Sequence, residues 1–174
     1  WAVRIGGRGH YAPSLEECVK GDPEVIELLN DLLSAELTAI NQYFVHAKMC
    51  GNWGYPRLAK KKREESIEEM RHADTVIERI LFLDGTPNMQ RLYPVRAGED
   101  PIEQHELDLA VEVEARARLN KGIALCVAKG DHGTRELLAA ILKEEEESID
   151  WLEAQLHAAR QIGKELYLSE QLTG

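Results

Sequence analysis

The residues of this chain with the clearest chemical potential are four glutamates and one histidine, spread over four helical stretches. Glu69 and His72 are three residues apart, so on a helix the carboxylate and the imidazole share one face and can bind the same metal ion. Such pairs arise often by chance on charged helices, but Glu36, Glu112 and Glu145 accompany this one. Glu36 and Glu112 lie among apolar neighbours, where a carboxylate is costly to bury unless it binds a proton, a partner or a metal.

Together these residues match a known ligand pattern. One Glu from each of two helices, plus Glu-x-x-His from each of two others, holds two iron ions in helical bundles. Glu145 begins the segment Glu145-Glu-Glu-Ser148, at the spacing where a second Glu-x-x-His would be expected. Carboxylates with imidazole suit iron and leave positions open for oxygen. The set predicts a carboxylate-bridged di-iron site, although each residue alone would more often be a solvated or ion-paired helix residue.

Tyr43 lies seven residues after Glu36, on the same helical face. Three roles are open for it: a hydrogen-bond donor to the metal ligands, a redox-active tyrosine, or an ordinary core residue.

Four long helices are predicted to position these residues, because apolar side chains recur at a period of 3.6. Asp22-Pro23 and Asp100-Pro101 each combine an N-cap with a proline at the first helical position. The predicted helices cover residues 22–51, 55–84, 100–130 and 133–162, and a short fifth helix is expected at about 164–172. Residues 85–101 contain three prolines and two glycines and no helical pattern. So long a connection predicts a crossover that lets the second and third helices lie parallel, as in an all-α, ferritin-type four-helix bundle.

Composition limits the classes of function. The net charge of −10 argues against nucleic acid, whose binding depends on cationic contacts to phosphate, and it would attract metal cations. Charged residues interrupt every apolar stretch before eighteen residues, which argues against a membrane span. Three cysteines in no motif favour a reducing compartment, so we expect a cytoplasmic protein. Residues 19–174 are expected to form one domain, with residues 1–18 as an N-terminal extension outside the bundle.

The residues now described resemble bacterioferritin from about residue 19 to 172. The blocks that carry the resemblance are Lys20-Gly-Asp22, Glu36-Leu-Thr-Ala-Ile-Asn-Gln-Tyr-Phe44, Glu65-Ser-Ile-Glu-Glu-Met-Arg-His-Ala-Asp74, Ile80-Leu-Phe-Leu83 and Ile149-Asp-Trp-Leu-Glu153. The resemblance implies a hollow shell of twenty-four subunits that oxidises ferrous iron and stores the ferric mineral. It also implies haem b between two-fold-related subunits, with Met70 of each as an axial ligand. Thioether ligation raises the haem potential, which suits electron delivery to the mineral from a ferredoxin-type donor for iron release.

The chain also departs from the family pattern. Ser148 stands where bacterioferritins place a histidine, so the second iron loses its imidazole, and a water, Glu144 or Glu147 would have to compensate. Glu64 stands where some members carry a histidine that faces the cavity. With Glu68, it is expected to form an acidic iron site on the inner surface.

Three functions are weighed. The leading one is an iron-storage subunit with ferroxidase activity, in which two ferrous ions reduce dioxygen or peroxide. The alternative, favoured by Ser148, is a haem-carrying shell subunit with impaired or absent ferroxidase activity that co-assembles with a competent subunit. A di-iron oxidase or peroxidase acting on another substrate predicts neither haem nor a shell. The sequence leaves open the choice of oxidant and whether the shell is homomeric or mixed.

Overall fold

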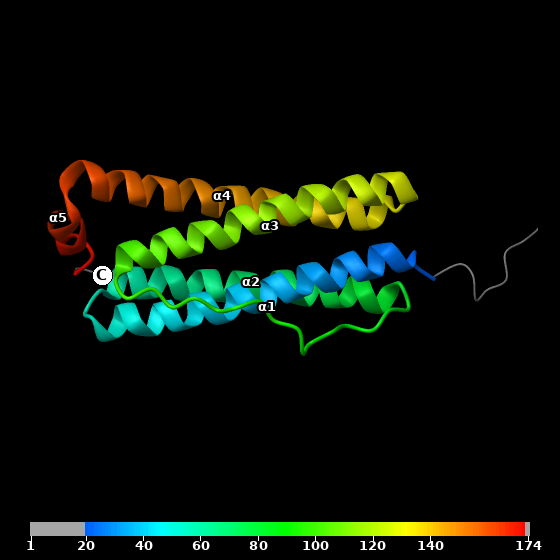
Figure 1. Cartoon of the computed structure of the whole chain (residues 1–174), viewed down its shortest axis with the longest axis horizontal. Coiled ribbons are helices and arrows are strands. Elements are labelled where there is room, and N and C mark those ends of the chain that lie inside the picture. Colours follow the sequence, from blue (N-terminus) through cyan, green and yellow to red (C-terminus); the bar gives the residue numbers. More distant parts are fainter. Residues whose placement is uncertain (1–19, 173–174) are drawn as a thin grey trace, which may run out of the picture.

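The computed structural model of the chain describes residues 20–172, and the predicted extension over residues 1–18 lies outside them. The described residues form five helices and no strand. The helices are α1 (Pro23–Asn52), α2 (Pro56–Phe82), α3 (Pro101–Lys129), α4 (His132–Ile162) and α5 (Lys164–Ser169). Figure 1 shows α1 and α2 as one antiparallel pair, α3 and α4 as a second pair packed over it, and α5 across one end. The predicted four-helix bundle is confirmed.

The helix starts follow from the capping residues in the sequence. An Oδ1 of Asp22 accepts a hydrogen bond from the backbone N–H of Glu24 at 2.8 Å, and Asp100 caps Ile102 in the same way, also at 2.8 Å. These bonds satisfy donors that the first helical turn leaves without partners. At the end of α3, Gly130 adopts a left-handed conformation (φ 72°), which stops the helix. The long helices therefore begin and end close to the predicted residues, whereas α5 is shorter than expected.

The crossover between α2 and α3 runs beside α1 along most of the bundle (Figure 1). Its backbone N–H groups donate to polar side chains of α1 at four points along that helix. These bonds join Asn88 to Asn30 (2.7 Å), Tyr93 to Thr38 (2.9 Å), Arg96 to Gln42 (3.2 Å) and Gly98 to His46 (3.0 Å). The crossover has no regular structure, so side chains of α1 rather than other backbone groups accept hydrogen bonds from these N–H groups. Its length makes α2 and α3 parallel, as the sequence predicted.

The interior of the bundle is divided along its length. One half is a continuous apolar core made by the start of α1, the end of α2, the end of α3 and the start of α4. The other half, towards α5, buries charged and polar side chains, among them Lys62, His105 and Asp108. Tyr167 attaches α5 to this end, because its hydroxyl lies 3.0 Å from Nε2 of His105. The predicted metal ligands lie where the two halves meet.

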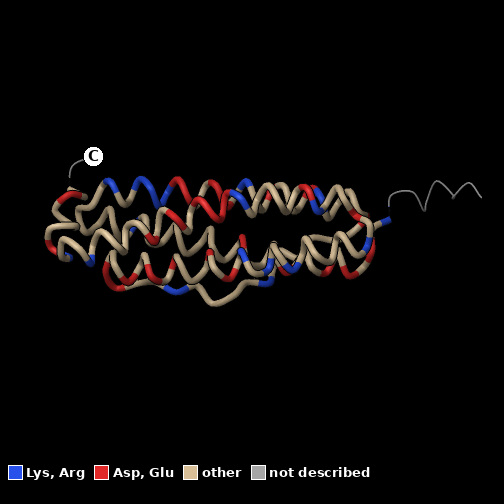
Figure 2. Tube along the Cα trace, turned by 90° about the horizontal axis from the view of Figure 1, so that it is seen from above, with Lys and Arg blue, Asp and Glu red and all other residues tan. Residues whose placement is uncertain are grey.

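Acidic and basic residues are interspersed along the whole length of the molecule (Figure 2). Among the helices described, none combines the length and apolar character needed to cross a lipid bilayer. Cys50 and Cys126 are free and buried, and Cys18 lies outside the described residues.

Candidate metal centre

Three helices bring four of the five predicted ligands together inside the bundle. Glu36 comes from α1, Glu69 and His72 from α2, and Glu145 from α4, and each is at most 5% exposed. One ligand atom from each lies within 4.8 Å of the others. Glu69 and His72 share a face of α2 because they are three residues apart. Three carboxylates and one imidazole around one point form a donor set that suits iron.

The imidazole of His72 is oriented by contacts on both of its nitrogens. Nδ1 lies 3.6 Å from Glu36, 3.4 Å from Glu69 and 3.2 Å from Glu145. Nε2 lies 2.7 Å from Oε2 of Glu144 at the surface. A proton on Nε2 donated to Glu144 leaves Nδ1 as the nitrogen that can bind a metal once its own proton is displaced. A carboxylate behind a histidine in this way fixes the tautomer of a metal ligand.

Glu112 of α3 reaches the same region from the other side. It is fully buried, and its Oε1 accepts a hydrogen bond from the hydroxyl of Tyr43 on α1. Its Oε2 is buried without a hydrogen-bond partner among the described residues. Of the three roles open for Tyr43, this geometry favours a donor that holds the Glu112 carboxylate. An unpaired buried carboxylate oxygen is costly, and a cation would remove that cost.

The buried acidic groups resist ionisation in the metal-free protein. Burial raises the pKa of Glu69 and of Glu112 well above the usual value, and the negative charges of Glu112 and Glu145, respectively, raise them further. Burial and the charge of Glu69 raise the pKa of Glu145 to about 7. Burial favours the neutral form of His72, but hydrogen bonds to Glu145, Glu36 and Glu69 outweigh it and raise the pKa of the imidazole. The cluster therefore holds protons that a divalent cation would displace.

Ser148 is in contact with a glutamate that the sequence did not single out. Its Oγ donates a hydrogen bond of 3.1 Å to Oε2 of Glu65, which is 3% exposed and pairs with Lys61. The sequence signal for Glu65 was its position four residues before Glu69, on the same face of α2. The two glutamates predicted to compensate for Ser148 lie elsewhere. Glu144 contacts His72, and Glu147 is exposed and lies 3.7 Å from Lys143.

The two residues of the predicted inner-surface site have different surroundings. Glu64 is exposed and lies 4.0 Å from Lys60. Glu68 instead belongs to a group with His72 and Glu144, whose ligand atoms lie within 4.8 Å of one another. The Glu68 carboxylate therefore lies near His72 and Glu144, and the structure does not place Glu64 in that group.

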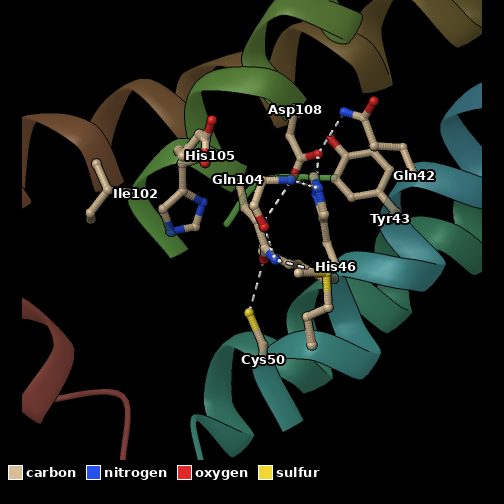
Figure 3. Close-up of polar contacts among 12 residues, drawn as sticks. Gln42, Tyr43, His46, Cys50, Ile102, Gln104, His105 and Asp108 are labelled. Atoms are coloured by element: carbon tan, nitrogen blue, oxygen red, sulfur yellow. Dashed lines mark hydrogen bonds and ion pairs between the residues drawn. The ribbon is translucent and has the colours of Figure 1, made fainter. Parts of the chain in front are cut away.

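A polar network centred on Asp108 lies next to the cluster, one helical turn from Glu112 on α3. The Asp108 carboxylate accepts from Lys62 at 2.6 Å, from His46 at 2.8 Å and from Gln42 at 3.0 Å, and all four residues are buried. Figure 3 shows residues of α1 and α3 facing each other across this network. Although burial alone would raise it, Lys62 and His46 hold the pKa of Asp108 down at about 2. This network was not predicted.

The crossover determines how His46 takes part in the network. The backbone N–H of Gly98 donates to Nε2 of His46 at 3.0 Å, so that nitrogen accepts and the proton lies on Nδ1, which donates to Asp108. A Cβ at position 98 would lie 2.7 Å from the backbone nitrogen of Gln104. Only glycine therefore allows the crossover to approach α3 closely enough for this bond.

Met70, the predicted haem ligand, lies on the outer surface of α2 and is 42% exposed. On the same face, Arg63 lies with Cζ 5.1 Å from the ring centroid of Phe44 of α1, which is also exposed. Ser66 joins the two helices there through a hydrogen bond of 3.0 Å to the carbonyl oxygen of Ile40. The face is thus partly apolar and carries a free thioether and a cation. These properties fit a flat, apolar, anionic cofactor held by a sulfur ligand.

Comparison with known proteins agrees with this geometry. A family model described as a ferritin-like domain matches residues 26–162, more than half of the chain. The chain is 51% identical to a bacterioferritin of Mycobacterium leprae over 152 residues, which cover 87% of this chain and 96% of the relative. It is 52% identical to a bacterioferritin of Streptomyces coelicolor over 151 residues, which cover 87% and 90% of the two chains. The chain belongs to the bacterioferritin family. A bacterioferritin of Brucella melitensis is 48% identical over 149 residues, 86% of this chain and 92% of the relative.

The first prediction concerns the pH dependence of this bacterioferritin without metal. The folded-state pKa of Glu145 is raised from 4.5 to about 7, so stability is lost as pH rises through this window. A shift of that size corresponds to about 3 kcal/mol. We expect the Tm of the metal-free protein to fall between pH 5 and 7.5, and to fall several degrees less in Glu145→Gln. Thermal unfolding in the presence of a chelator measures this. Glu146→Gln, the same change on the exposed neighbour, should follow the wild type; equal slopes in all three proteins would contradict the prediction.

The second prediction concerns the Asp108 network. Asp108→Ala leaves the ammonium of Lys62 buried without a partner and should cost about 3–5 kcal/mol of unfolding free energy. The double variant Asp108→Ala/Lys62→Met should recover part of this loss, because it removes both charges. Denaturant unfolding measures both values. Glu114→Ala, which removes a surface carboxylate of the same helix, should cost about 1 kcal/mol or less. A loss for Asp108→Ala no larger than that control would contradict the assigned role.

Proposed function

We propose that this chain is an iron-storage subunit that binds Fe(II) in pairs at the cluster of Glu36, Glu69, His72, Glu112 and Glu145 and oxidises it. The observation that carries the proposal is the meeting of three carboxylates and one imidazole, from three helices, within 4.8 Å inside a bundle of the bacterioferritin family. Each pair of ferrous ions gives two electrons to dioxygen or peroxide, and the ferric product is stored as mineral.

The residues divide the work of binding. Glu36, Glu69 and His72 would bind the first Fe(II), and Glu145, which meets these residues and also interacts with Glu112, could bridge to a second ion. The hydroxyl of Tyr43 holds Glu112. Because burial and mutual repulsion raise the pKa values of these carboxylates, binding of Fe(II) would release protons, and the charge of the ion would replace them. At neutral pH, a bound dication therefore compensates the charge of these carboxylates better than protons do.

Assembly and haem binding belong to the same proposal. The subunits form a hollow shell of twenty-four copies, and haem b lies between two-fold-related copies with Met70 of each as an axial ligand. Support for this comes from the exposed thioether of Met70 and the partly apolar face around Phe44. The haem would supply one-electron transfer to the stored mineral, with Met70 holding it and Arg63 offering a positive charge to its carboxylates. A ferredoxin-type donor and an inner-surface site at Glu64 and Glu68 remain predictions.

A second function is favoured by one observation. Ser148 provides a hydroxyl at the second metal position and is already hydrogen-bonded to Glu65. A subunit with a weak second position would oxidise iron slowly and would depend on a competent partner in a mixed shell.

The third prediction tests ferroxidase activity. Fe(II) is mixed rapidly with the aerated protein, and its oxidation is followed by the increase in ferric absorbance. The initial rate for Glu69→Ala should fall to that of Fe(II) in buffer alone, because the cluster loses a central carboxylate. The exposed variant Glu146→Gln should keep the wild-type rate. Ser148→His should raise the rate if the second position limits it. A wild type no faster than Glu69→Ala, with Ser148→His faster than both, would favour the slow subunit; three equal rates would contradict any ferroxidase role.

The fourth prediction tests the haem. Protein purified from haem-replete cells should carry a Soret band, and Met70→Leu should lose it, because leucine keeps the apolar volume and removes the thioether. Met89→Leu, the same change at an exposed position of the crossover, should leave the spectrum unchanged. Elution of all three as one large assembly would exclude misfolding. A colourless wild type, or a Met70→Leu variant with full haem and an unchanged spectrum, would contradict the assignment.

A further inference from the structure

The second metal position contains a glutamate that takes no part in the ligand set described so far. Glu65 lies four residues before Glu69 on α2, and Ser148 lies three residues after Glu145 on α4. These spacings place the pair on the inward faces of their helices, one turn away from Glu69 and Glu145. There the hydroxyl of Ser148 donates to Glu65 at 3.1 Å. The hydroxyl therefore orients a carboxylate at the level where the site lacks an imidazole.

Two glutamates of the proposed ligand set have buried carboxylate oxygens without hydrogen-bond partners among the described residues, and a cation would satisfy them. Glu112 is fully buried, and its Oε2 has no hydrogen-bond partner among the residues described. Oε1 of Glu145 is likewise buried without a hydrogen-bond partner among these residues, so an unpaired carboxylate oxygen also remains one helical turn from Ser148 on α4.

Lys61 balances Glu65 in the metal-free protein. Its ammonium pairs with Oε1 of Glu65, while the Lys61 side chain is 33% exposed. The same ammonium lies 5.2 Å from the centroid of the Trp151 ring, which offers it a second favourable contact. A long lysine side chain near solvent can move away when a dication arrives. Lys61 is therefore a counterion that a metal can replace, unlike the fully buried Lys62.

We propose that Glu65 takes the place of the missing imidazole and binds the second Fe(II) together with Glu112 and Glu145, while the Ser148 hydroxyl orients Glu65. The second position is then built from oxygen ligands alone, whereas the first contains His72. Oxygen ligands suit hard cations and bind late first-row divalent ions less tightly than imidazole does. This inference rests on the proposed di-iron function and adds a ligand to it.

The test uses Co(II) binding to the intact metal-free assembly, without oxygen, followed by its visible absorption and by calorimetry. The wild type should bind two Co(II) per subunit, one more tightly than the other. Glu65→Gln should lose only the weaker equivalent, because loss of a ligand exceeds the roughly 10–100-fold effect of an outer partner. Ser148→Ala should weaken that equivalent about tenfold. Glu147→Gln, which removes the exposed carboxylate beside Ser148, should change neither equivalent.

A double variant separates ligation from a structural role of Glu65. Ser148→His/Glu65→Gln should regain the second equivalent, because an imidazole at position 148 makes the Glu65 carboxylate dispensable. Diffraction at the cobalt edge should show the second peak beside Glu65 in the wild type and beside position 148 in the double variant. Two unchanged equivalents in Glu65→Gln, loss of the second in Glu147→Gln, or no recovery in the double variant would overturn the proposal.

The same titration distinguishes this proposal from the function on which it rests. His72→Ala should abolish the tighter equivalent, whatever Glu65 does. A wild type that binds no Co(II), or a His72→Ala variant that binds like the wild type, contradicts the di-iron function itself. A wild type with two equivalents, of which His72→Ala loses the tighter and Glu65→Gln loses none, contradicts only the role of Glu65.

Discussion

Mutual repulsion among carboxylates buried inside one bundle is the constraint on which the rest of the structure depends. Glu36, Glu69, Glu112 and Glu145 are at most 3% exposed, and burying a charge without a partner costs several kcal/mol. Without metal, the protein reduces this cost by holding protons, as the raised pKa values of Glu69, Glu112 and Glu145 show. The site is therefore a source of instability until a cation arrives. The continuous apolar core in the other half of the bundle supplies the stability that permits it.

Asp108 and Glu112 are buried carboxylates of the same helix that differ in their hydrogen-bond donors. The two residues are one helical turn apart on α3, and both are fully buried. Asp108 is surrounded by three donors, and its pKa is lowered to about 2. Glu112 has one donor and a free oxygen, and its pKa is raised. The fold thus supplies donors to a buried carboxylate that has a structural role. We infer that the buried carboxylates without such donors bind a cation from solution.

What could be predicted from the sequence depended on spacing within single helices. Asp22 and Asp100 predicted where α1 and α3 begin. The separation of Glu69 and His72 was enough to predict that they share one face of α2. Contacts between helices were harder to predict. The carboxylate of Asp108 pairs with Lys62, 46 residues away, and that pairing depends on the rotation and register of two helices.

Glu65 was missed for a related reason. It belongs to a run of charged residues, 60–65, half of which are exposed, and its burial follows from how α2 packs against α4. The resemblance to bacterioferritins identified what was missing at Ser148, and the predicted compensation was a water, Glu144 or Glu147. The residue in contact with Ser148 instead comes from another helix, because the nearest side chains in a bundle are those across the interface.

An unequal pair of metal positions follows from the same contacts. The first position has an imidazole whose tautomer is fixed by Glu144, whereas the second, as proposed, has carboxylates only and must displace Lys61. The first ion should therefore bind more tightly and fill earlier, and its charge should then favour ionisation of Glu145, the carboxylate that the two positions share. Filling would be sequential, with the weaker position taking up and releasing iron. In a storage subunit weak binding at the second position is an advantage, because oxidised iron has to leave that position for the mineral before further Fe(II) can bind there.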